Sequence, residues 1–204
     1  MKVLITGGAG YIGSHLADYF QKAGDTVTVL DNLSTGSLKN IEHNLHSQSF
    51  QFIHGNILDR DLMKRLVEDH DLICHLAAVV GVNHVLKNPV RSIIDNAVGT
   101  ETVLTLAHQF KRRTLFASTS EVYGKNPHVP FSEDHDSLFG STKVFRWSYA
   151  IAKALGEHLC FAYHGEGLPV SIVRYVNSYG PRLDPRGYGS VVAKFVTQAL
   201  TGNP

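Results

Sequence analysis

Short runs of aliphatic and β-branched residues alternate along this chain with longer stretches of helical periodicity. Runs of strand length cover residues 2–6, 26–30, 50–57, 71–78, 113–119 and 168–175. The stretches between them predict amphipathic helices over 11–24, 60–68, 90–110 and 143–164. Strands that alternate with helices in this way predict an α/β fold, a doubly wound parallel sheet covered by helices on both faces.

The first predicted strand leads directly into a turn with three glycines, Gly7, Gly10 and Gly13, which opens the first helix. Glycines at such a turn let backbone N–H groups approach a pyrophosphate, and the helix dipole adds positive potential there. The spacing is G-x-x-G-x-x-G rather than the commoner G-x-G-x-x-G, and tight turns use glycine in any case. Because the turn stands between a strand and a helix, the pattern favours a dinucleotide site.

Asp31 follows at the end of the second predicted strand. A carboxylate at this place can accept hydrogen bonds from both ribose hydroxyls of an adenosine, and it repels a 2′-phosphate. An aspartate that only caps a loop would not need the glycine turn before it. The two features together predict NAD rather than NADP as the cofactor.

Composition narrows the class of protein. The 204 residues are 43% hydrophobic and 18% charged, with a formal net charge of +1, so charge gives no reason to expect nucleic acid or an acidic membrane as partner. No run approaches the roughly 18 apolar residues of a membrane helix, and the chain opens without the pattern of a secretion signal. Cys74 and Cys160 lie in apolar stretches, which favours buried free thiols and a cytoplasmic protein. The 12 histidines show no metal-ligand spacing, so no metal site is expected.

Tyr149 and Lys153 lie four residues apart in the helix predicted over 143–164, so they share one face. A nearby ammonium and a positive nicotinamide both favour the phenolate, which lowers the pKa of Tyr149 toward the working pH. Tyr149 could then take the proton of a sugar hydroxyl while the same carbon gives up a hydride. Such pairs occur in many helices, but this one follows the motif STSEVYG.

Seven motifs stand in one order along the chain: TGGAGYIG, LDNLSTG, GNILD, HLAA, STSEVYG, YAIAK and RYVNSYGPR. With them the sequence resembles the extended short-chain dehydrogenases/reductases over nearly its whole length, and specifically the NAD-dependent nucleotide-sugar epimerases, dehydratases and decarboxylases. The resemblance implies a Rossmann fold and a tightly held NAD that oxidises a sugar carbon and usually takes the hydride back.

The resemblance also implies roles for individual residues. Thr119 stands at the position of the family's catalytic hydroxyl, and Tyr149, Lys153 and Glu121 complete the catalytic set. The implied cofactor contacts are Gly7, Gly10, Tyr11, Ile12, Gly13, Asp31, Asn32, Asn56, Ile57, Leu76, Ala77, Ala78, Asn96, Ser118, Tyr149, Lys153 and Tyr175. For Asn96 a buried structural role is an equal alternative. The implied substrate contacts are Ser120, Glu121, Asn177 and Arg182.

Two local departures from the motifs of particular branches narrow the choice of reaction. Dehydratases resemble TDE where this chain has TSE, so 4,6-dehydration is disfavoured, whereas decarboxylases of UDP-glucuronate and many epimerases resemble TSE. Decarboxylases with a similar RW-x-Y stretch carry an arginine after the GPR segment, and here Val192 takes its place, with Arg186 as a possible substitute. Losing a bidentate carboxylate clamp costs affinity for a uronic acid. Phe145, Arg146 and Trp147 either line the sugar pocket or pack the helix. We therefore expect an NAD-dependent UDP-sugar 4-epimerase, with a UDP-glucuronate decarboxylase as the alternative.

The chain divides in this interpretation into an NAD-binding Rossmann domain over 1–175 and the start of a truncated substrate-binding region over 176–204. Members of the family continue well beyond this length, so this chain is a fragment or a partner supplies the rest. The polar, turn-rich segment 124–141 is predicted to be a functional loop. The expected partners are a nucleotide-sugar and a second copy that docks through helices of the Rossmann domain. An NAD-binding regulator without activity is a further alternative, but such proteins usually lose the tyrosine or the lysine, and both are present.

Overall fold

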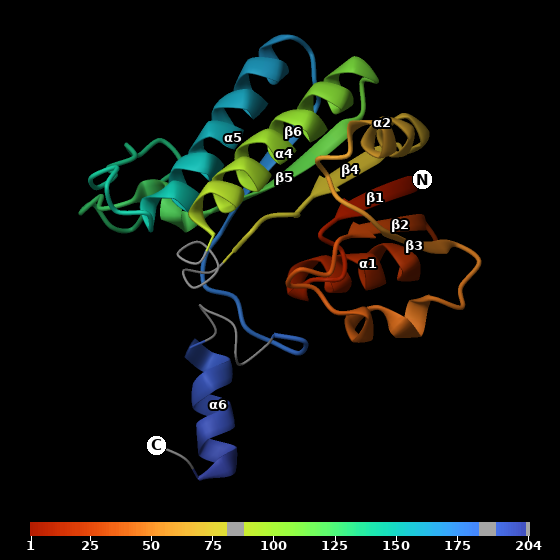
Figure 1. Cartoon of the computed structure of the whole chain (residues 1–204), viewed down its shortest axis with the longest axis horizontal. Helices are drawn as coiled ribbons and strands as arrows, with labels where there is room; N and C mark the ends of the chain where they lie inside the picture. The colour runs from red at the N-terminus through yellow and green to blue at the C-terminus, as the bar shows by residue number, and fades with distance from the viewer. Residues whose placement is uncertain (81–87, 184–190, 203–204) are drawn as a thin grey trace.

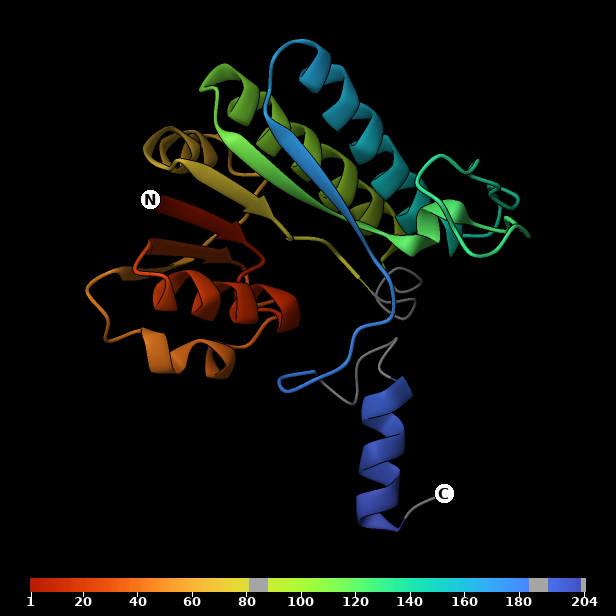
Figure 2. The ribbon, with the colours of Figure 1, turned by 180° about the vertical axis from the view of Figure 1, so that it is seen from behind.

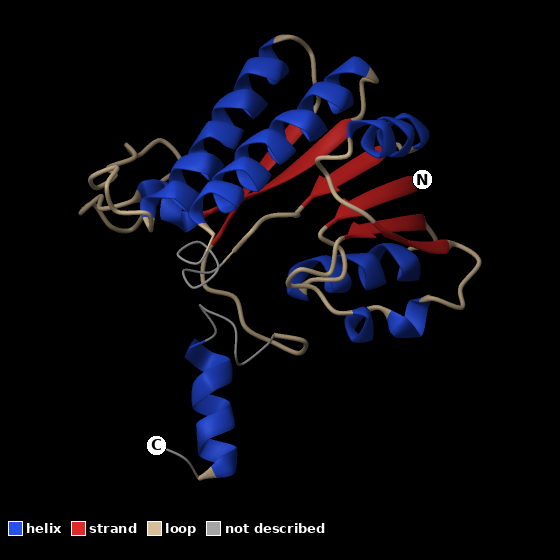
Figure 3. Ribbon diagram, viewed as in Figure 1, coloured by secondary structure: helices blue, strands red, loops and turns tan. Residues whose placement is uncertain are grey.

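The computed structural model describes residues 1–80, 88–183 and 191–202. Its centre is a six-stranded sheet in which all paired strands are parallel (Figure 3). The order across the sheet is β3 (Phe50–His54), β2 (Thr26–Asp31), β1 (Lys2–Thr6), β4 (Leu72–His75), β5 (Arg113–Thr119) and β6 (Val170–Tyr175). The direction of winding reverses between β1 and β4. Open parallel sheets bind their ligands beyond the carboxyl ends of the strands at such a reversal.

Helices cover both faces of the sheet, as the sequence predicted (Figures 1 and 2). One face carries α1 (Tyr11–Lys22) with the short 3-10 turns η1 (Leu38–Asn40) and η2 (Glu42–Asn44). The other carries α2 (Arg60–Asp69), α4 (Pro89–Gln109) and α5 (Trp147–Gly165), which pack side by side. This is the doubly wound Rossmann architecture.

The alternating pleat of the strands divides the core into two clusters. Val3 and Ile5 of β1 are fully buried and pack with Ala17 of α1, whereas Leu4 between them packs with Met63 of α2 on the opposite face. Because both faces of the central strands are covered, nearly every position must be apolar. That is why these strands appear in the sequence as continuous hydrophobic runs.

Two strands end earlier than the hydrophobic runs do. β3 stops at His54 instead of residue 57, and the Asn56 side chain accepts a hydrogen bond from Leu58 N–H (3.0 Å), which closes a turn. β4 stops at His75 instead of residue 78. Beyond it, Asn96 makes two hydrogen bonds with the backbone of Val79 (2.8 and 3.1 Å). Side-chain amides thus replace the strand ladder at both places.

The active-site helix also begins later than predicted. α5 starts at Trp147, whereas the sequence suggested residue 143. Trp147 N–H bonds the Val144 carbonyl (3.1 Å) and Ser148 N–H bonds the Phe145 carbonyl (3.0 Å), so residues before the helix form tighter i→i+3 turns. Arg146 at the boundary already has helical backbone angles (φ −51°, ψ −35°).

The segment 124–141 is an ordered loop held to the sheet by its own base. Gly124 has φ +62°, and a Cβ there would collide with the carbonyl of Leu138. Lys125 N–H donates to that carbonyl (2.7 Å), and the ring of Phe131 stacks on Tyr123 with centroids 4.4 Å apart. Tyr123 belongs to η3 (Ser120–Tyr123), which directly follows β5, so the loop is fastened next to the carboxyl end of that strand.

The last described element is α6 (Val191–Thr201), in which no residue is buried. It extends away from the sheet in both views (Figures 1 and 2). The division of the chain at residues 175 and 176 stays a prediction. Among the described residues, no helix combines the length and the apolar character needed to cross a bilayer.

The contact between α5 and the sheet leads to a first prediction. A Cβ at Gly156 would come 2.5 Å from Cζ of Phe116 and 3.2 Å from Cγ2 of Thr100, and the Phe116 ring is fully buried. Gly156→Ala should therefore lower the free energy of unfolding by about 1–3 kcal/mol through overpacking. In urea denaturation, the control Gly165→Ala, which adds its methyl into open space at the end of the same helix, should not destabilise the protein. Equal midpoints for the two variants would contradict the close packing.

Candidate active site

A cleft of about 750 Å³ lies at the carboxyl edge of the sheet, where the winding reverses. It draws residues from the ends of β1, β2, β4, β5 and β6 and from the start of α5. The residues predicted from sequence that line it are Gly7, Gly10, Tyr11, Ile12, Gly13, Asp31, Asn32, Asn56, Ile57, Leu76, Ala77, Ala78, Ser118, Thr119, Ser120, Glu121, Tyr149, Lys153, Tyr175, Asn177 and Arg182. The structure thus brings together in one cleft nearly all the side chains that the sequence singled out.

Asn96 is the predicted cofactor contact that does not line this cleft. Its side chain is buried. Its amide oxygen accepts a hydrogen bond from Val79 N–H, and its amide nitrogen donates to the Val79 carbonyl. Val79 itself lines the cleft. Asn96 therefore fixes the wall of the cleft from behind, and a contact of Asn96 with the cofactor stays a prediction.

The glycine turn after β1 is built for close approach of a ligand to the backbone. Gly7 has φ +72°, and a Cβ there would come 2.8 Å from the Ala77 nitrogen; at Gly13 a Cβ would collide with the Gly7 carbonyl. Gly10 caps α1 without a side-chain hydrogen bond, and the first turn of α1 holds no acidic residue. The free N–H groups and the dipole at this helix start are therefore directed at the cleft, which suits a pyrophosphate.

Asp31 holds this turn from the end of β2. Its carboxylate accepts hydrogen bonds from Ala9 N–H (3.0 Å) and Leu33 N–H (2.8 Å). Burial raises the pKa of Asp31, and these two backbone donors oppose the rise. A carboxylate has about four lone-pair sites, so the carboxylate keeps capacity for ribose hydroxyls. The residues of the site therefore fit a dinucleotide without a 2′-phosphate.

Tyr149, Thr119 and Glu121 meet at the other end of the cleft. Thr119 ends β5, and its Oγ1 accepts a hydrogen bond from Glu121 N–H (3.2 Å), which caps η3 and turns Glu121 into the cleft. Packing around the Glu121 carboxylate raises its pKa, although part of the side chain is open to solvent, and the nearby Arg146 opposes the rise. Glu121 can therefore hold a proton more readily than an ordinary surface glutamate.

In the protein without a cofactor, the prediction that Lys153 lowers the pKa of Tyr149 is wrong. Burial, and then the charge of Glu121, raise the pKa of Tyr149. Lys153 Nζ instead donates to the carbonyl of Ala117 (2.6 Å) and lies 4.8 Å from the centroid of the Phe116 ring. A positive charge brought beside the phenol is what would reverse this shift.

A buried ionic network, which sequence analysis missed, holds β5, β6 and α5 together beneath these groups. Ser118 Oγ donates to Glu157, and Arg174 donates to both carboxylate oxygens of Glu157 (2.9 and 2.7 Å). Arg174 also donates to the carbonyl of Glu133 in the loop 124–141 (3.0 Å). The sequence signal that could have drawn attention to Glu157 was its spacing, because Glu157 follows Lys153 by four residues on the same helix face.

His75 is a second buried group that the sequence did not single out. Its ring nitrogens lie 2.8 Å from Thr6 Oγ1 and 3.1 Å from Thr100 Oγ1, so it joins β1, β4 and α4. Burial, and then the charge of Lys153, lower the pKa of His75 to about 3. His75 is therefore neutral at physiological pH and acts as a structural clip.

Arg182 lines the cleft, but its guanidinium is already engaged. Nη2 donates to Asp18 Oδ2 at 2.6 Å, which ties the segment after β6 to α1. Nη1 is buried without a hydrogen-bond partner. A substrate contact of Arg182 stays a prediction, and Nη1 is the atom free to make it. Arg186 lies outside the described residues, and Val192 on α6 does not line the cleft.

Some lining residues, among them Ser37, Lys39 and Asn40, were not predicted as contacts. The polar run directly after Asp31 was the signal for these three. Arg146, for which the sequence left open a place in the sugar pocket or in the packing of the helix, lines the cleft. In the part of the chain that the structure describes, no group of three histidine, cysteine or acidic residues could hold a metal.

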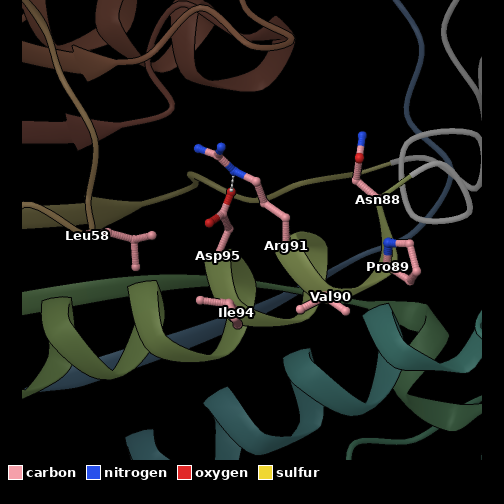
Figure 4. Close-up of a pocket in the computed structure, with 7 residues that line it drawn as sticks. All are labelled: Leu58, Asn88, Pro89, Val90, Arg91, Ile94 and Asp95. Atoms are coloured by element: carbon pink, nitrogen blue, oxygen red, sulfur yellow. Dashed lines mark hydrogen bonds and ion pairs between the residues drawn. The ribbon is translucent and has the colours of Figure 1, made fainter.

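A second hollow of about 540 Å³ lies at the start of α4 (Figure 4). Leu58, Val90 and Ile94 line it, and its two charged groups are already paired, Arg91 with Asp95 at 3.4 Å. Asp95 also lines the main cleft. With these charges paired, the described residues around this hollow offer no convergent charged groups for a ligand.

The sequence matches the model of the NAD-dependent epimerase/dehydratase family over residues 3–204. The chain belongs to that family. The cofactor of this family is NAD, in agreement with the site geometry. The assignment to the extended short-chain dehydrogenases/reductases is thereby confirmed.

Two curated relatives of this epimerase/dehydratase are decarboxylases. It is 46% identical over 202 residues to the UDP-N-acetyl-alpha-D-glucosaminuronate decarboxylase of Bacillus cytotoxicus, which covers 99% of this chain and 62% of that protein. It is 38% identical over 205 residues to UDP-glucuronic acid decarboxylase 1 of Xenopus tropicalis, covering 98% of this chain and 46% of that protein. The chain thus spans less than two thirds of either relative.

Two solved structures similar to this chain are of enzymes that are named for other reactions of the family. UDP-glucose 4-epimerase of Thermotoga maritima, solved with UDP-glucose, matches with a TM-score of 0.88 and 34% identity over 100% of this chain and 64% of that one. The dTDP-glucose 4,6-dehydratase DesIV of Streptomyces venezuelae, solved with NAD, matches with a TM-score of 0.87 and 33% identity over 99% and 63%. The fold is therefore shared with epimerase and dehydratase members of the family.

The buried ammonium of this epimerase/dehydratase gives a pH-dependent prediction. Burial lowers the pKa of Lys153 from 10.5 to about 8. Between these values the unfolded chain binds the proton that the folded chain has lost, so this group makes stability rise with pH. The free energy of unfolding of wild type minus that of Lys153→Met should rise between pH 8 and 10, with a slope approaching about 1.4 kcal/mol per pH unit.

Urea denaturation at a series of pH values measures this difference. Lys64→Met, which replaces an exposed lysine of α2, should keep the wild-type slope. A Lys153→Met curve parallel to wild type over the whole window would show that the ammonium is not buried.

Proposed function

We propose that this protein decarboxylates a UDP-linked glucuronate, with NAD as a cofactor that is not consumed. The observation that carries the proposal is Glu121, placed in one cleft with Tyr149 and close enough to raise the tyrosine's pKa. The names of the curated relatives support the decarboxylase over the 4-epimerase that the sequence favoured.

The cofactor would lie with its pyrophosphate at the Gly7–Gly13 turn and its adenosine ribose at Asp31. NAD when bound supplies the hydride acceptor for the sugar C4 and gives the hydride back. Its positive nicotinamide is also the charge that favours the Tyr149 phenolate, against the effect of burial and Glu121.

The side chains of this chain carry the proton transfers. Tyr149 takes the proton of the C4 hydroxyl, and Thr119 orients that oxygen by a hydrogen bond. A 4-keto uronic acid is a β-keto acid, so the bond from C5 to the carboxylate breaks, carbon dioxide leaves and an enolate remains. Glu121, with its raised pKa, delivers the proton that replaces the carboxylate at C5. Tyr149 returns its proton to the C4 oxygen at the end.

This function predicts that the full-length protein releases carbon dioxide from UDP-glucuronate or UDP-N-acetylglucosaminuronate and forms the corresponding UDP-pentose without net reduction of NAD. Tyr149→Phe should release none and keep its affinity for NAD, because only the proton-accepting oxygen is removed. Tyr19→Phe, at an exposed tyrosine of α1, is the matched control and should keep full activity. Mass spectrometry of the nucleotide-sugar and trapped carbon dioxide measure the products.

The same experiment separates the alternatives. Interconversion of UDP-glucose and UDP-galactose with no carbon dioxide from either uronate would favour the 4-epimerase, as the similarity to the Thermotoga maritima enzyme allows. NAD binding without conversion of any of these sugars would favour the regulator.

We also propose that two copies associate through α4 and α5. These helices pack against each other on one face of the sheet, yet Ile94, Val98, Ile151 and Leu155 are 38–46% exposed on them. Apolar side chains that recur every four residues on two adjacent helices form a continuous stripe suited to the same stripe of a second copy.

Sedimentation velocity tests this association. Wild type should sediment as a dimer, and Leu155→Glu should shift it to monomer because the interface would bury an unpaired charge. The control Phe161→Glu changes another exposed apolar residue of α5 outside this stripe and should leave the dimer intact. A monomeric wild type at micromolar concentration would contradict the proposal.

A further inference from the structure

Basic side chains in the cleft are few, and two of the four among the described residues are already engaged. Among the described residues that line it, the cations are Lys39, Arg146, Lys153 and Arg182. Lys153 is buried and donates to Ala117, and Arg182 is paired with Asp18. Lys39 lies on η1, on the side of the cleft that Asp31 occupies. Arg146 is therefore the available cation at the Tyr149 end.

The position of Arg146 follows from the helix. It precedes Tyr149 by three residues and has helical backbone angles, so its side chain leaves the helix one turn away on the same side. Its guanidinium carbon lies 5.7 Å from the centroid of the Trp147 ring and has no hydrogen-bond or ion-pair partner among the described residues. Arg146 is also the charge that opposes the rise in the pKa of Glu121, and both residues line the cleft.

The substrate brings a carboxylate to the same place. In a hexuronic acid the carboxylate is attached to C5, the carbon next to C4. If the C4 hydroxyl contacts Tyr149, the carboxylate must lie within a few atoms of it, at the distance that one helical turn spans. The planar fork of a guanidinium can bind both oxygens of a carboxylate at once.

We propose that Arg146 binds the carboxylate of the uronic acid and sets the preference of this site for a uronic acid over a neutral hexose. This inference rests on the proposed function for its substrate class. The arginine that binds the carboxylate then stands at the start of α5. In the decarboxylases that the sequence resembles, this arginine follows the GPR segment, at the position that Val192 occupies here. A clamp at Arg146 also fixes the plane of the carboxylate relative to the C4 carbonyl, which is what loss of carbon dioxide requires. The Trp147 ring beneath the guanidinium restricts its motion.

The test measures binding of two ligands to the full-length, NAD-loaded protein. Tyr149→Phe serves as the background so that neither ligand is converted during calorimetry. In that background, Arg146→Gln should raise the Kd for UDP-glucuronate about 10- to 100-fold, the loss expected for a charge-assisted bidentate contact. The Kd for UDP-glucose should stay within about twofold. Arg146→Lys keeps the charge without the fork and should give an intermediate loss for UDP-glucuronate only.

Lys39→Met is the matched control, since it removes another unpaired cation from the far end of the same cleft. It should change the two Kd values by the same factor, so that the ratio of uronate to hexose affinity is unchanged. Circular dichroism confirms that each variant is folded, and Arg146→Lys carries the test should Arg146→Gln fail to fold.

Three results would overturn the inference. These are equal losses for both ligands in Arg146→Gln, no loss for either, or no preference of the parent protein for UDP-glucuronate. Failure of the proposed function gives a different result. An Arg146-dependent preference in a protein that releases no carbon dioxide keeps the carboxylate site and refutes decarboxylation. Carbon dioxide release that Arg146→Gln leaves unchanged refutes the carboxylate site alone.

Discussion

The close contact between the turn after β1 and the end of β4 is the constraint on which the cleft depends. Gly7 comes so near to Ala77 that no side chain fits between them. Thr6 Oγ1 accepts a hydrogen bond from Ala77 N–H (3.3 Å) and also bonds His75, while Leu76 N–H donates to the Thr6 carbonyl (3.1 Å). The carboxyl ends of the two strands are thus fixed to each other, and the space beyond them is where the dinucleotide would lie.

The catalytic helix is held to this frame by charges rather than by apolar packing alone. Lys153 and Glu157 are both nearly fully buried, and each gives its charge to a specific partner, the Ala117 carbonyl and Arg174. Burying such charged groups costs desolvation free energy and adds little net stability. Removing one partner, however, leaves the other charge buried and unpaired. Their effect here is to fix the register of α5 against β5, which sets the distance of Tyr149 from Thr119.

The sequence predicted the order of strands and helices because the buried strands are continuous apolar runs and the glycine turn stands directly between a strand and a helix. It placed Tyr149 and Lys153 together because they share a helix face, and it placed Thr119 with them through the resemblance to the family. It did not reveal the contacts that depend on the folded chain. The pairing of Arg182 with Asp18 joins residues 164 positions apart, and burial, together with the charge of Glu121, raises the pKa of Tyr149 where a lowered pKa was expected. Strand ends were missed where the amides of Asn56 and Asn96 replace the ladder.

Asp31 connects cofactor choice to the integrity of the fold. The same carboxylate that is expected to repel a 2′-phosphate also accepts the N–H groups of Ala9 and Leu33, and it fills the space against which Gly36 packs. An engineer who replaces Asp31 to admit NADP removes two anchors of the phosphate-binding turn in the same step. Cofactor switching in this protein is therefore a problem of re-anchoring a backbone loop as much as one of charge, and a neutral acceptor such as asparagine at this position is the more conservative starting point.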